Sequence, residues 1–234
     1  MRANGVEEIT GGARLNQVLT QMRLVASPGN LDAKLAGMRR FGIHAESLIG
    51  LSTPEIRKIA RHIGRDQPLA EALWETGVYD ARILASLITD PALLRIAVMD
   101  RWARDFDSWS VCDACCCNAF DRSPHAWKQI AKWAKSDAEF VRRAAFATIA
   151  ALAVHDKKAD DQVFLAALPL LERYAFDERN FVKKAVNWAL RNIGKRNAAL
   201  LSAAIGCAER IRLQGTSPAR WIAADALREL RARR

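Results

Sequence analysis

The sequence predicts an all-α protein made of stacked helix pairs. Three observations lead to this prediction. Helix start and stop signals recur along the chain, no convincing run of alternating strand residues is present, and a short motif repeats after about forty residues. Short connections between successive helices are typical of an all-α architecture.

The expected elements begin after a polar, Gly-containing stretch. Residues 1–12 are predicted to be a flexible leader, followed by a single repeat domain over residues 13–234. A helix over 15–26 places its apolar residues on one stripe. Ser52 or Thr53 can cap another helix, for which Pro54 suits the first position and Gly64 the end. Further helices are expected at 31–40, 68–75, 80–88, 91–106, 107–118, 124–134, 138–154, 160–174, 178–193, 197–213 and from 217 to the end.

The internal repeat concerns the segments FVRRA at 140–144 and FVKKA at 181–185, which are offset by 41 residues. Weaker echoes occur at 80–87 and 217–227. A period near forty with paired helices is typical of HEAT-like repeats, which stack into an α–α superhelix, a solenoid with a concave binding face. Chance similarity between two helices is the alternative.

The balance of charge favours a polyanionic partner. The 234 residues carry a formal net charge of +10, with a pI near 9.8. Nucleic acid and an acidic membrane surface both fit such a charge. No apolar run is long enough to span a bilayer, and the N-terminal residues lack the apolar core of a signal peptide. Five cysteines, three of them consecutive, make a poor disulfide framework, so a reducing cytoplasm is expected.

The segment DSWSVCDACCCN at 107–118 contains the first candidate site. Trp109 and Asp113 are four residues apart, which places both on one face of a helix capped by Asp107 or Ser108. Such a pair can be a packed aromatic beside a solvated acid, or an aromatic wall beside an anion that stabilises a cation. The neighbouring cysteines form a C-x-x-C without a second ligand pair, so packing between helices is favoured over a metal site.

The helix near 178–193 contains the second candidate site. Lys184, Trp188, Arg191 and Lys195 fall on one stripe, whereas a separate apolar stripe is expected to be buried. A Trp among cations can be a half-buried residue on a solvated face. It can also be part of a surface where cations neutralise phosphates and the aromatic ring packs on sugar or base. Arg142 and Arg143 lie at the equivalent place one repeat earlier and point about 100° apart.

These features together resemble the AlkD-type DNA alkylation repair family. The similarity runs from about residue 31 to residue 230 and includes RRFGI at 39–43, GLSTPEIRKIA at 50–60, and the FVRRA and VKKAVNWALR helices. Their order and spacing make the resemblance fairly specific. It implies a HEAT-like solenoid with a concave basic groove and the activity of a monofunctional DNA glycosylase. The substrate class would be positively charged N3- and N7-alkylated purines, such as 3-methyladenine and 7-methylguanine.

The resemblance also implies roles for single residues. Trp109 matches the aromatic beside the deoxyribose of the lesion, Asp113 the catalytic carboxylate and Trp188 a second aromatic of the cleft. Arg143 matches an arginine on the phosphate backbone, and Arg142, Lys184, Arg191 and Lys195 are further candidates for DNA contact. Ser110 stands where the family often has Asp, and only Phe41 is available as an additional N-terminal aromatic. These departures concern substrate range and rate more than the reaction.

Three functions follow as hypotheses. The first is an alkylpurine DNA glycosylase of base excision repair that acts on double-stranded DNA. It needs no metal or organic cofactor and has no membrane partner. It can work as a monomer in the cytoplasm, on the nucleoid. The second is a non-catalytic HEAT-repeat protein that binds damaged or branched DNA. The third is a scaffold for an acidic protein. Asp113 inside a cationic cleft favours the first, because a pure DNA binder would gain nothing from a carboxylate that repels phosphate.

Overall fold

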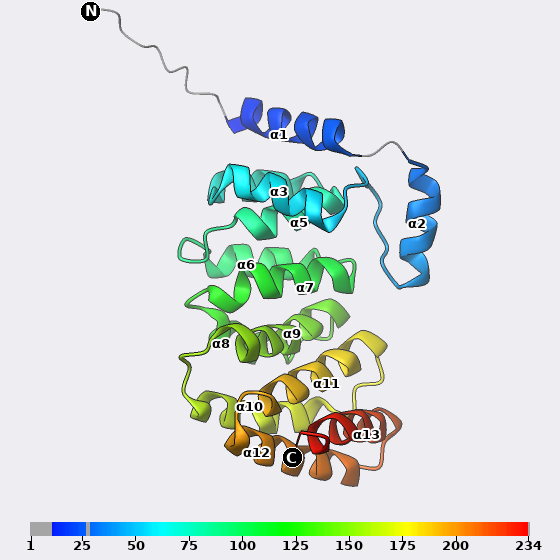
Figure 1. Ribbon diagram of the computed structural model, residues 1–234, viewed down its shortest axis with the longest axis vertical. Coiled ribbons are helices and arrows are strands. Elements are labelled where there is room, and N and C mark those ends of the chain that lie inside the picture. Colours follow the sequence, from blue (N-terminus) through cyan, green and yellow to red (C-terminus); the bar gives the residue numbers. More distant parts are fainter. Residues whose placement is uncertain (1–10, 27–28, 234) are drawn as a thin grey trace, which may run out of the picture. The chain divides into compact units, whose positions relative to one another are not determined.

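The computed structural model describes residues 11–26 and 29–233 of the chain (Figure 1). In this part the chain forms thirteen α-helices and one turn of 3₁₀ helix, and it contains no strand. The prediction of an all-α protein is therefore confirmed.

The chain divides into two compact units, Met1–Leu93 and Leu94–Arg234. The first contains α1 (Gly11–Val25), α2 (Leu31–Arg40), α3 (Thr53–Ile63), α4 (Gln67–Glu75) and α5 (Tyr79–Ile88). The second contains α6 (Ile96–Arg104), α7 (Trp109–Asn118), the 3₁₀ turn Phe120–Arg122, α8 (Ala126–Trp133), α9 (Glu139–His155), α10 (Asp161–Tyr174), α11 (Asn180–Gly194), α12 (Ala198–Leu213) and α13 (Ser217–Arg231).

In the first unit, α3, α4 and α5 pack together and α1 covers α3 and α4. Leu73, Trp74 and Leu84 are fully buried in this core. The connection into α3 is held by Asp80, whose buried carboxylate accepts hydrogen bonds from the backbone N–H groups of residues 49, 50 and 51 at 2.7, 3.1 and 2.9 Å. Three charge-assisted bonds of this kind fix the loop and satisfy an otherwise costly buried carboxylate.

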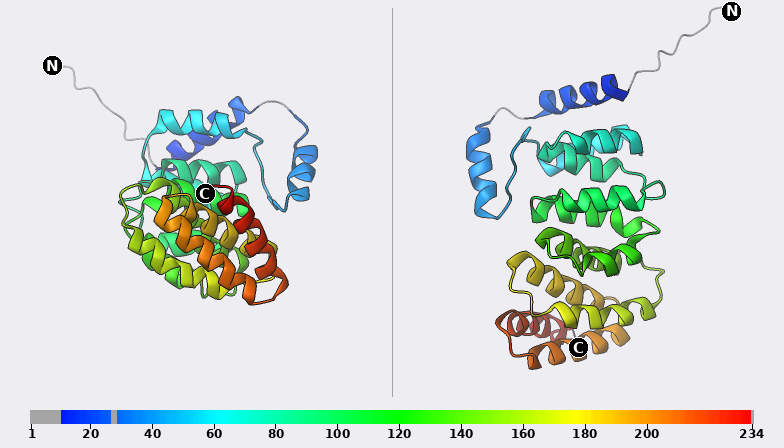
Figure 2. Two further views of the ribbon diagram at one scale, coloured as in Figure 1. Left: turned by 60° about the horizontal axis from the view of Figure 1, so that its bottom comes forward. Right: turned by 180° about the vertical axis from the view of Figure 1, so that it is seen from behind.

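The second unit is built of two rows of helices. Its helices follow one another in chain order as neighbouring pairs (Figure 2). Helices α7, α9, α11 and α13 pack side by side in one row, while α10 and α12 pack against each other in the other row. All of the candidate site residues except Phe41 lie on the first row or at the end of α11, so this row is the part of the fold that determines the geometry of the site.

The motif that repeats in the sequence also recurs in space. Phe140 and Phe181, the first residues of the two copies, pack with ring centroids 5.5 Å apart. The apolar stripe expected on α11 is buried: Val182, Val186, Ala189 and Ile193 are fully inaccessible. Within this unit the helix pairs therefore show the HEAT-like arrangement expected from the repeat.

Two expected helix starts differ from the structure by more than two residues. Helix α1 begins at Gly11, so residues 11 and 12 are helical, and the rest of the expected leader lies outside the described residues. The helix expected over 91–106 is shorter, because Asp90 forms a turn: its side chain accepts a bond from the N–H of Ala92 at 3.0 Å and its carbonyl one from Leu93 at 3.1 Å. Such local bonds by Asp compete with helix formation. A single domain over 13–234 stays a prediction.

Candidate functional site

The centre of the candidate site is an ion pair between α7 and α9. The guanidinium of Arg143 donates through Nε to Oδ1 of Asp113 at 2.9 Å and through Nη2 to Oδ2 at 2.7 Å. Its Nη1 donates to the carbonyl of Phe181 at 2.5 Å. The side chain of Arg143 is 7% exposed and that of Asp113 is 20% exposed. Both carboxylate oxygens of Asp113 are thus bound by one guanidinium, while a fifth of the side chain remains exposed.

Small side chains let α7 and α9 approach closely enough for this pair to form. Cys112 and Cys116 are fully buried, and their thiols donate to the carbonyls of Phe140 and Ala144, each at 3.6 Å. These contacts flank Asp113 on the face of α7 that meets α9. The cysteines therefore pack between helices, as the sequence predicted, and this packing sets the register that brings Asp113 opposite Arg143.

Burial and charge act in opposite directions on the pair. Burial raises the pKa of the Asp113 carboxyl, and the charge and hydrogen bonds of Arg143 oppose that rise. Burial would lower the pKa of Arg143, but the charge and hydrogen bonds of Asp113 outweigh it, so the pKa of this guanidinium is raised. Arg143 therefore stays protonated, and Asp113 is a carboxylate whose charge is costly to desolvate and is compensated by one neighbour.

The two tryptophans occupy different helices of the same row. Trp109 is the first residue of α7 and lies one turn before Asp113, with Ser108 as the residue that precedes the helix. Trp188 lies on α11, and both rings are partly exposed. The structure brings Asp113 of α7 together with Arg143 of α9, whereas Trp188 lies on α11, the next helix of the row after α9. Phe41 belongs to the first unit and is 74% exposed.

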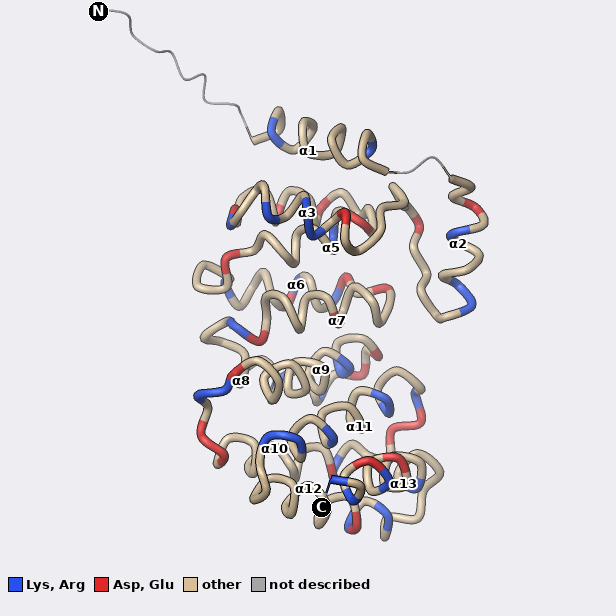
Figure 3. Tube along the Cα trace, viewed as in Figure 1, with Lys and Arg blue, Asp and Glu red and all other residues tan. Residues whose placement is uncertain are grey.

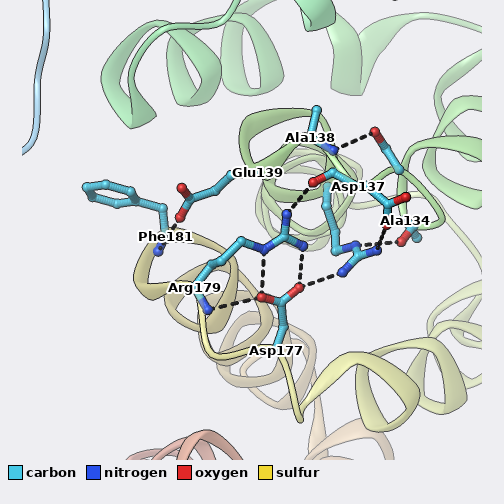
Figure 4. A network of polar contacts seen from close by, with 9 residues as sticks. Ala134, Asp137, Ala138, Glu139, Asp177, Arg179 and Phe181 are labelled. Carbon is cyan, nitrogen blue, oxygen red and sulfur yellow. Dashed lines mark hydrogen bonds and ion pairs between the residues drawn. The ribbon is translucent and has the colours of Figure 1, made fainter.

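Arg142 points away from Arg143 and into a polar network between α9 and the start of α11. Its Nη1 donates to Asp177 at 2.7 Å and its Nε to the carbonyl of Ala134 at 3.1 Å. Asp177 also accepts from Nε of Arg179 at 2.9 Å, and Figure 4 shows this carboxylate facing the Arg179 guanidinium. The Arg142 side chain is only 11% exposed. Its guanidinium is bound to the protein, and its role as a DNA contact stays a prediction.

The cations of the α11 stripe are of two kinds. Lys184 is exposed and makes no ion pair with any described residue. By contrast, Arg191 donates to Glu229 of α13 at 2.5 Å, and Lys195 pairs with the same carboxylate. Figure 3 shows acidic and basic residues together on α13 beside α11. The stripe is thus partly neutralised by acidic residues that the sequence argument did not consider.

The pairing of Asp113 with Arg143 is not among the features predicted from the sequence, where Asp113 is assigned to catalysis and Arg143 to phosphate. A signal was available, because a buried carboxylate needs a cationic partner and Arg143 lies on the next helix of the row. The same holds for Arg191 and Glu229, which are 38 residues apart, close to one repeat.

Two further properties of the described residues bear on function. No group of three or more His, Cys, Asp or Glu side chains in residues 11–26 and 29–233 is arranged to hold a metal ion. None of the helices in that same part of the chain combines the length and the apolar character needed to cross a membrane.

Comparison with known proteins adds two findings. The model of a family described as "DNA alkylation repair enzyme" matches residues 20–230. A solved structure described as "a new family of proteins related to the HEAT-like repeat DNA glycosylases with affinity for branched DNA structures" is similar, with a TM-score of 0.72 and 21% identity over 84% of this chain and 82% of that one. No curated protein matches the sequence. The structural likeness confirms the expected HEAT-like fold; the concave basic groove stays a prediction.

Proposed function

Because the chain belongs to the DNA alkylation repair enzyme family, we propose that it is a DNA glycosylase that excises N3- and N7-alkylated purines from duplex DNA. The observation that carries the proposal is the Asp113 carboxylate, which is held by two hydrogen bonds from Arg143 and belongs to a side chain that is 20% exposed. A fixed, partly exposed anion one helical turn after Trp109 suits the stabilisation of a developing cation.

The chemistry of the substrate explains why one carboxylate is enough. An N3- or N7-alkylated purine is already cationic, so the bond from its nitrogen to C1′ breaks without a general acid and the base leaves neutral. Positive charge then develops on the deoxyribose. Asp113 stabilises that charge and orients a water molecule, whose oxygen bonds to C1′ while its proton passes to the carboxylate or to solvent, as in glycoside hydrolysis.

The other residues have supporting roles in this proposal. Trp109 and Trp188 offer ring faces to the cationic sugar and base, each contributing about 0.5–2 kcal/mol. Arg143 favours the ionised form of the carboxylate, against the effect of burial on its pKa, and holds it in place. Lys184, which makes no protein ion pair in the described part, is the first candidate for a phosphate contact. Arg142, Arg191 and Lys195 would reach phosphate only by leaving their carboxylate partners.

The proposal does not require the base to leave the helix stack. Many enzymes that act on bases flip them into a pocket. In this protein the row of helices would bind the DNA backbone while the alkylated base stays stacked in the duplex. Bulky adducts would then be accepted as well. A cocrystal with the lesion extruded into a protein pocket would contradict this part of the proposal.

The decisive experiment measures release of free 3-methyladenine and 7-methylguanine from methylated duplex DNA. We expect release by the wild type and a rate lower by about 100-fold for Asp113→Asn. DNA affinity should be retained in that variant. Asp137→Asn is the matched control, since Asp137 is a fully exposed carboxylate and should leave the rate unchanged. Equal rates for Asp113→Asn and wild type would exclude the proposed role of Asp113.

A second candidate function is non-catalytic binding of damaged or branched DNA. The observation that favours it is the similar solved structure, whose description records affinity for branched DNA. The wild type would then release no base, and would bind a four-way junction more tightly than a linear duplex of equal length. In that case Ser110→Asp, which introduces the carboxylate that the family often has, would be the first change to test for gain of activity.

A further inference from the structure

The first unit contains a basic pocket that is separate from the Asp113 site. It has a volume of about 360 Å³ and is lined by three arginines, Arg57, Arg61 and Arg65, together with Ala60, Gly64 and Leu87. The pocket lies where α3 ends beside the last turn of α5. None of the described residues that line it is acidic, so these residues present positive charge and apolar surface.

Among the described residues, Arg57 and Arg61 have no acidic partner that compensates their charge. Arg57 and Arg61 are one turn apart on α3, both are exposed, and neither forms an ion pair with a described residue. Like charges at this spacing destabilise a helix by about 0.2–0.5 kcal/mol. The acidic residue of α3, Glu55, accepts bonds from the N–H and hydroxyl of Ser52 at 2.6 and 2.7 Å. It therefore serves the start of the helix and leaves the two arginines uncompensated.

The third arginine is held in place by the protein. Arg65 donates through Nη1 to the carbonyls of Leu87, at 3.2 Å, and Thr89 at the end of α5. This contact satisfies orphan carbonyls of a helix end, a structural role that is common for arginine. The dipole of α3 favours cations only within its last turn, so it does not account for Arg57 in the middle of the helix.

We propose that this pocket binds a phosphate group through Arg57, Arg61 and Arg65. Planar guanidiniums bind phosphate oxygens in a bidentate manner, and one fixed and two adaptable arginines can surround a tetrahedral anion. Figure 3 shows basic positions along α3. The phosphate can belong to a DNA backbone or to a free phosphorylated molecule; both present the same oxyanion chemistry. The site lies outside the unit that holds Asp113 and does not rest on glycosylase activity.

The test compares the wild-type full chain with Arg57→Gln/Arg61→Gln and with the control Lys58→Gln. Lys58 is an exposed cation on α3 outside the pocket lining. Arg65 is left intact because its bonds to α5 support the fold, and a thermal melt verifies that the double variant is folded. Binding of pyrophosphate is measured by calorimetry, and binding of a 20-base-pair duplex is measured over a range of salt concentrations.

We expect the double variant to bind pyrophosphate at least about tenfold more weakly, while the control matches the wild type. If duplex affinity falls too, and the slope of log K against log salt becomes shallower by about 0.9 for each lost contact, the phosphate is that of DNA. If only pyrophosphate binding falls, it is that of a free molecule. The proposal is overturned if the double variant differs from the control in neither assay.

Discussion

Two ion pairs in the same row of helices differ in burial and, with it, in their effect on the carboxyl group. Arg143 and Asp113 join α9 to α7, with side chains 7% and 20% exposed. Arg191 and Glu229 join α11 to α13, both 29% exposed. Burial raises the pKa of Asp113 against the opposing effect of Arg143. At Glu229 burial also favours a higher pKa, but hydrogen bonds and charges from Lys195 and Arg191 outweigh it and the pKa is lowered.

This comparison shows that an arginine partner does not by itself determine the direction in which the pKa of a carboxyl group shifts; burial matters as well. On burial Asp113 loses hydrating water and gains one charged partner, Arg143. The charged form of its carboxyl group therefore has a higher free energy than it would have in water. Such an anion has more to gain from an additional positive charge, such as a developing sugar cation. The half-exposed pair is already well solvated and compensated, so it can release its cations to a stronger anion at small cost.

The largest effect is expected from Arg143→Met. The change removes the only guanidinium on Asp113 in the described structure and leaves a buried carboxylate without compensation. The free energy of unfolding should fall by about 3–5 kcal/mol, as measured by urea denaturation. Adding Asp113→Asn to this variant should recover part of the loss. Equal stability of Arg143→Met and the double variant would contradict the presence of an uncompensated charge on Asp113 in Arg143→Met.

Asp177→Asn should have the next largest effect. The side chain of Asp177 is 4% exposed and accepts from two arginines, Arg142 and Arg179. An amide keeps one acceptor oxygen but loses the charge, so the free energy of unfolding should fall by roughly 2 kcal/mol. The exposed Asp137→Asn is the control within the same network. If Asp177→Asn lowered the free energy of unfolding no more than Asp137→Asn does, Asp177 would contribute as little to stability as the half-exposed pairs.

Glu229→Gln should cost less than about 1 kcal/mol of stability, because the pair is partly solvated. It also releases Lys195 and weakens the hold on Arg191, which still lies 3.7 Å from Asp225, so duplex affinity at low salt should increase and its salt dependence should become steeper. The measurement is fluorescence anisotropy of a labelled duplex. Unchanged binding would mean that these two cations do not face DNA.

The smallest expected effect is on the pH dependence of stability, where the two carboxylates should act with opposite signs. The raised pKa of Asp113 gives a contribution that is present below its unfolded-state pKa of about 3.9 and is lost as the pH rises through its folded pKa. The lowered pKa of Glu229 gives one that is present above about 4.3 and is lost as the pH falls. With rising pH, Asp113→Asn should therefore gain stability relative to the wild type and Glu229→Gln should lose it. Denaturation from pH 3 to 7 measures both, and slopes of equal sign would contradict the comparison.

Those features of the fold that depend on residues within a single helix could be predicted from the sequence. The apolar stripe of α11 and the cap signals around α3 depend on neighbours within a few residues, and both were predicted. The start of the helix expected over 91–106 was wrong for a local reason as well, because the Asp90 side chain and carbonyl close a turn there.

The site could be predicted only in part. The four-residue spacing put Trp109 and Asp113 on one face of a helix, and the divergence of Arg142 from Arg143 follows from helix geometry. Which carboxylate each arginine meets depends on the distance between helices 30 to 38 residues apart in sequence, and that distance is set by packing. The sequence pattern does not indicate this distance between helices. The individual roles of these residues in DNA binding and catalysis stay predictions.

The cysteines of α7 have one more consequence. Alkylating agents attack thiolates as well as purines, so a protein that works on alkylated DNA is exposed to the same electrophiles as its substrate. Cys112 and Cys116 are fully buried, and burial raises the pKa of both thiols. A buried neutral thiol is a poor nucleophile. Cys112 and Cys116, which set the register of the candidate site, are thereby protected from the alkylating agents whose lesions in DNA the protein is proposed to repair.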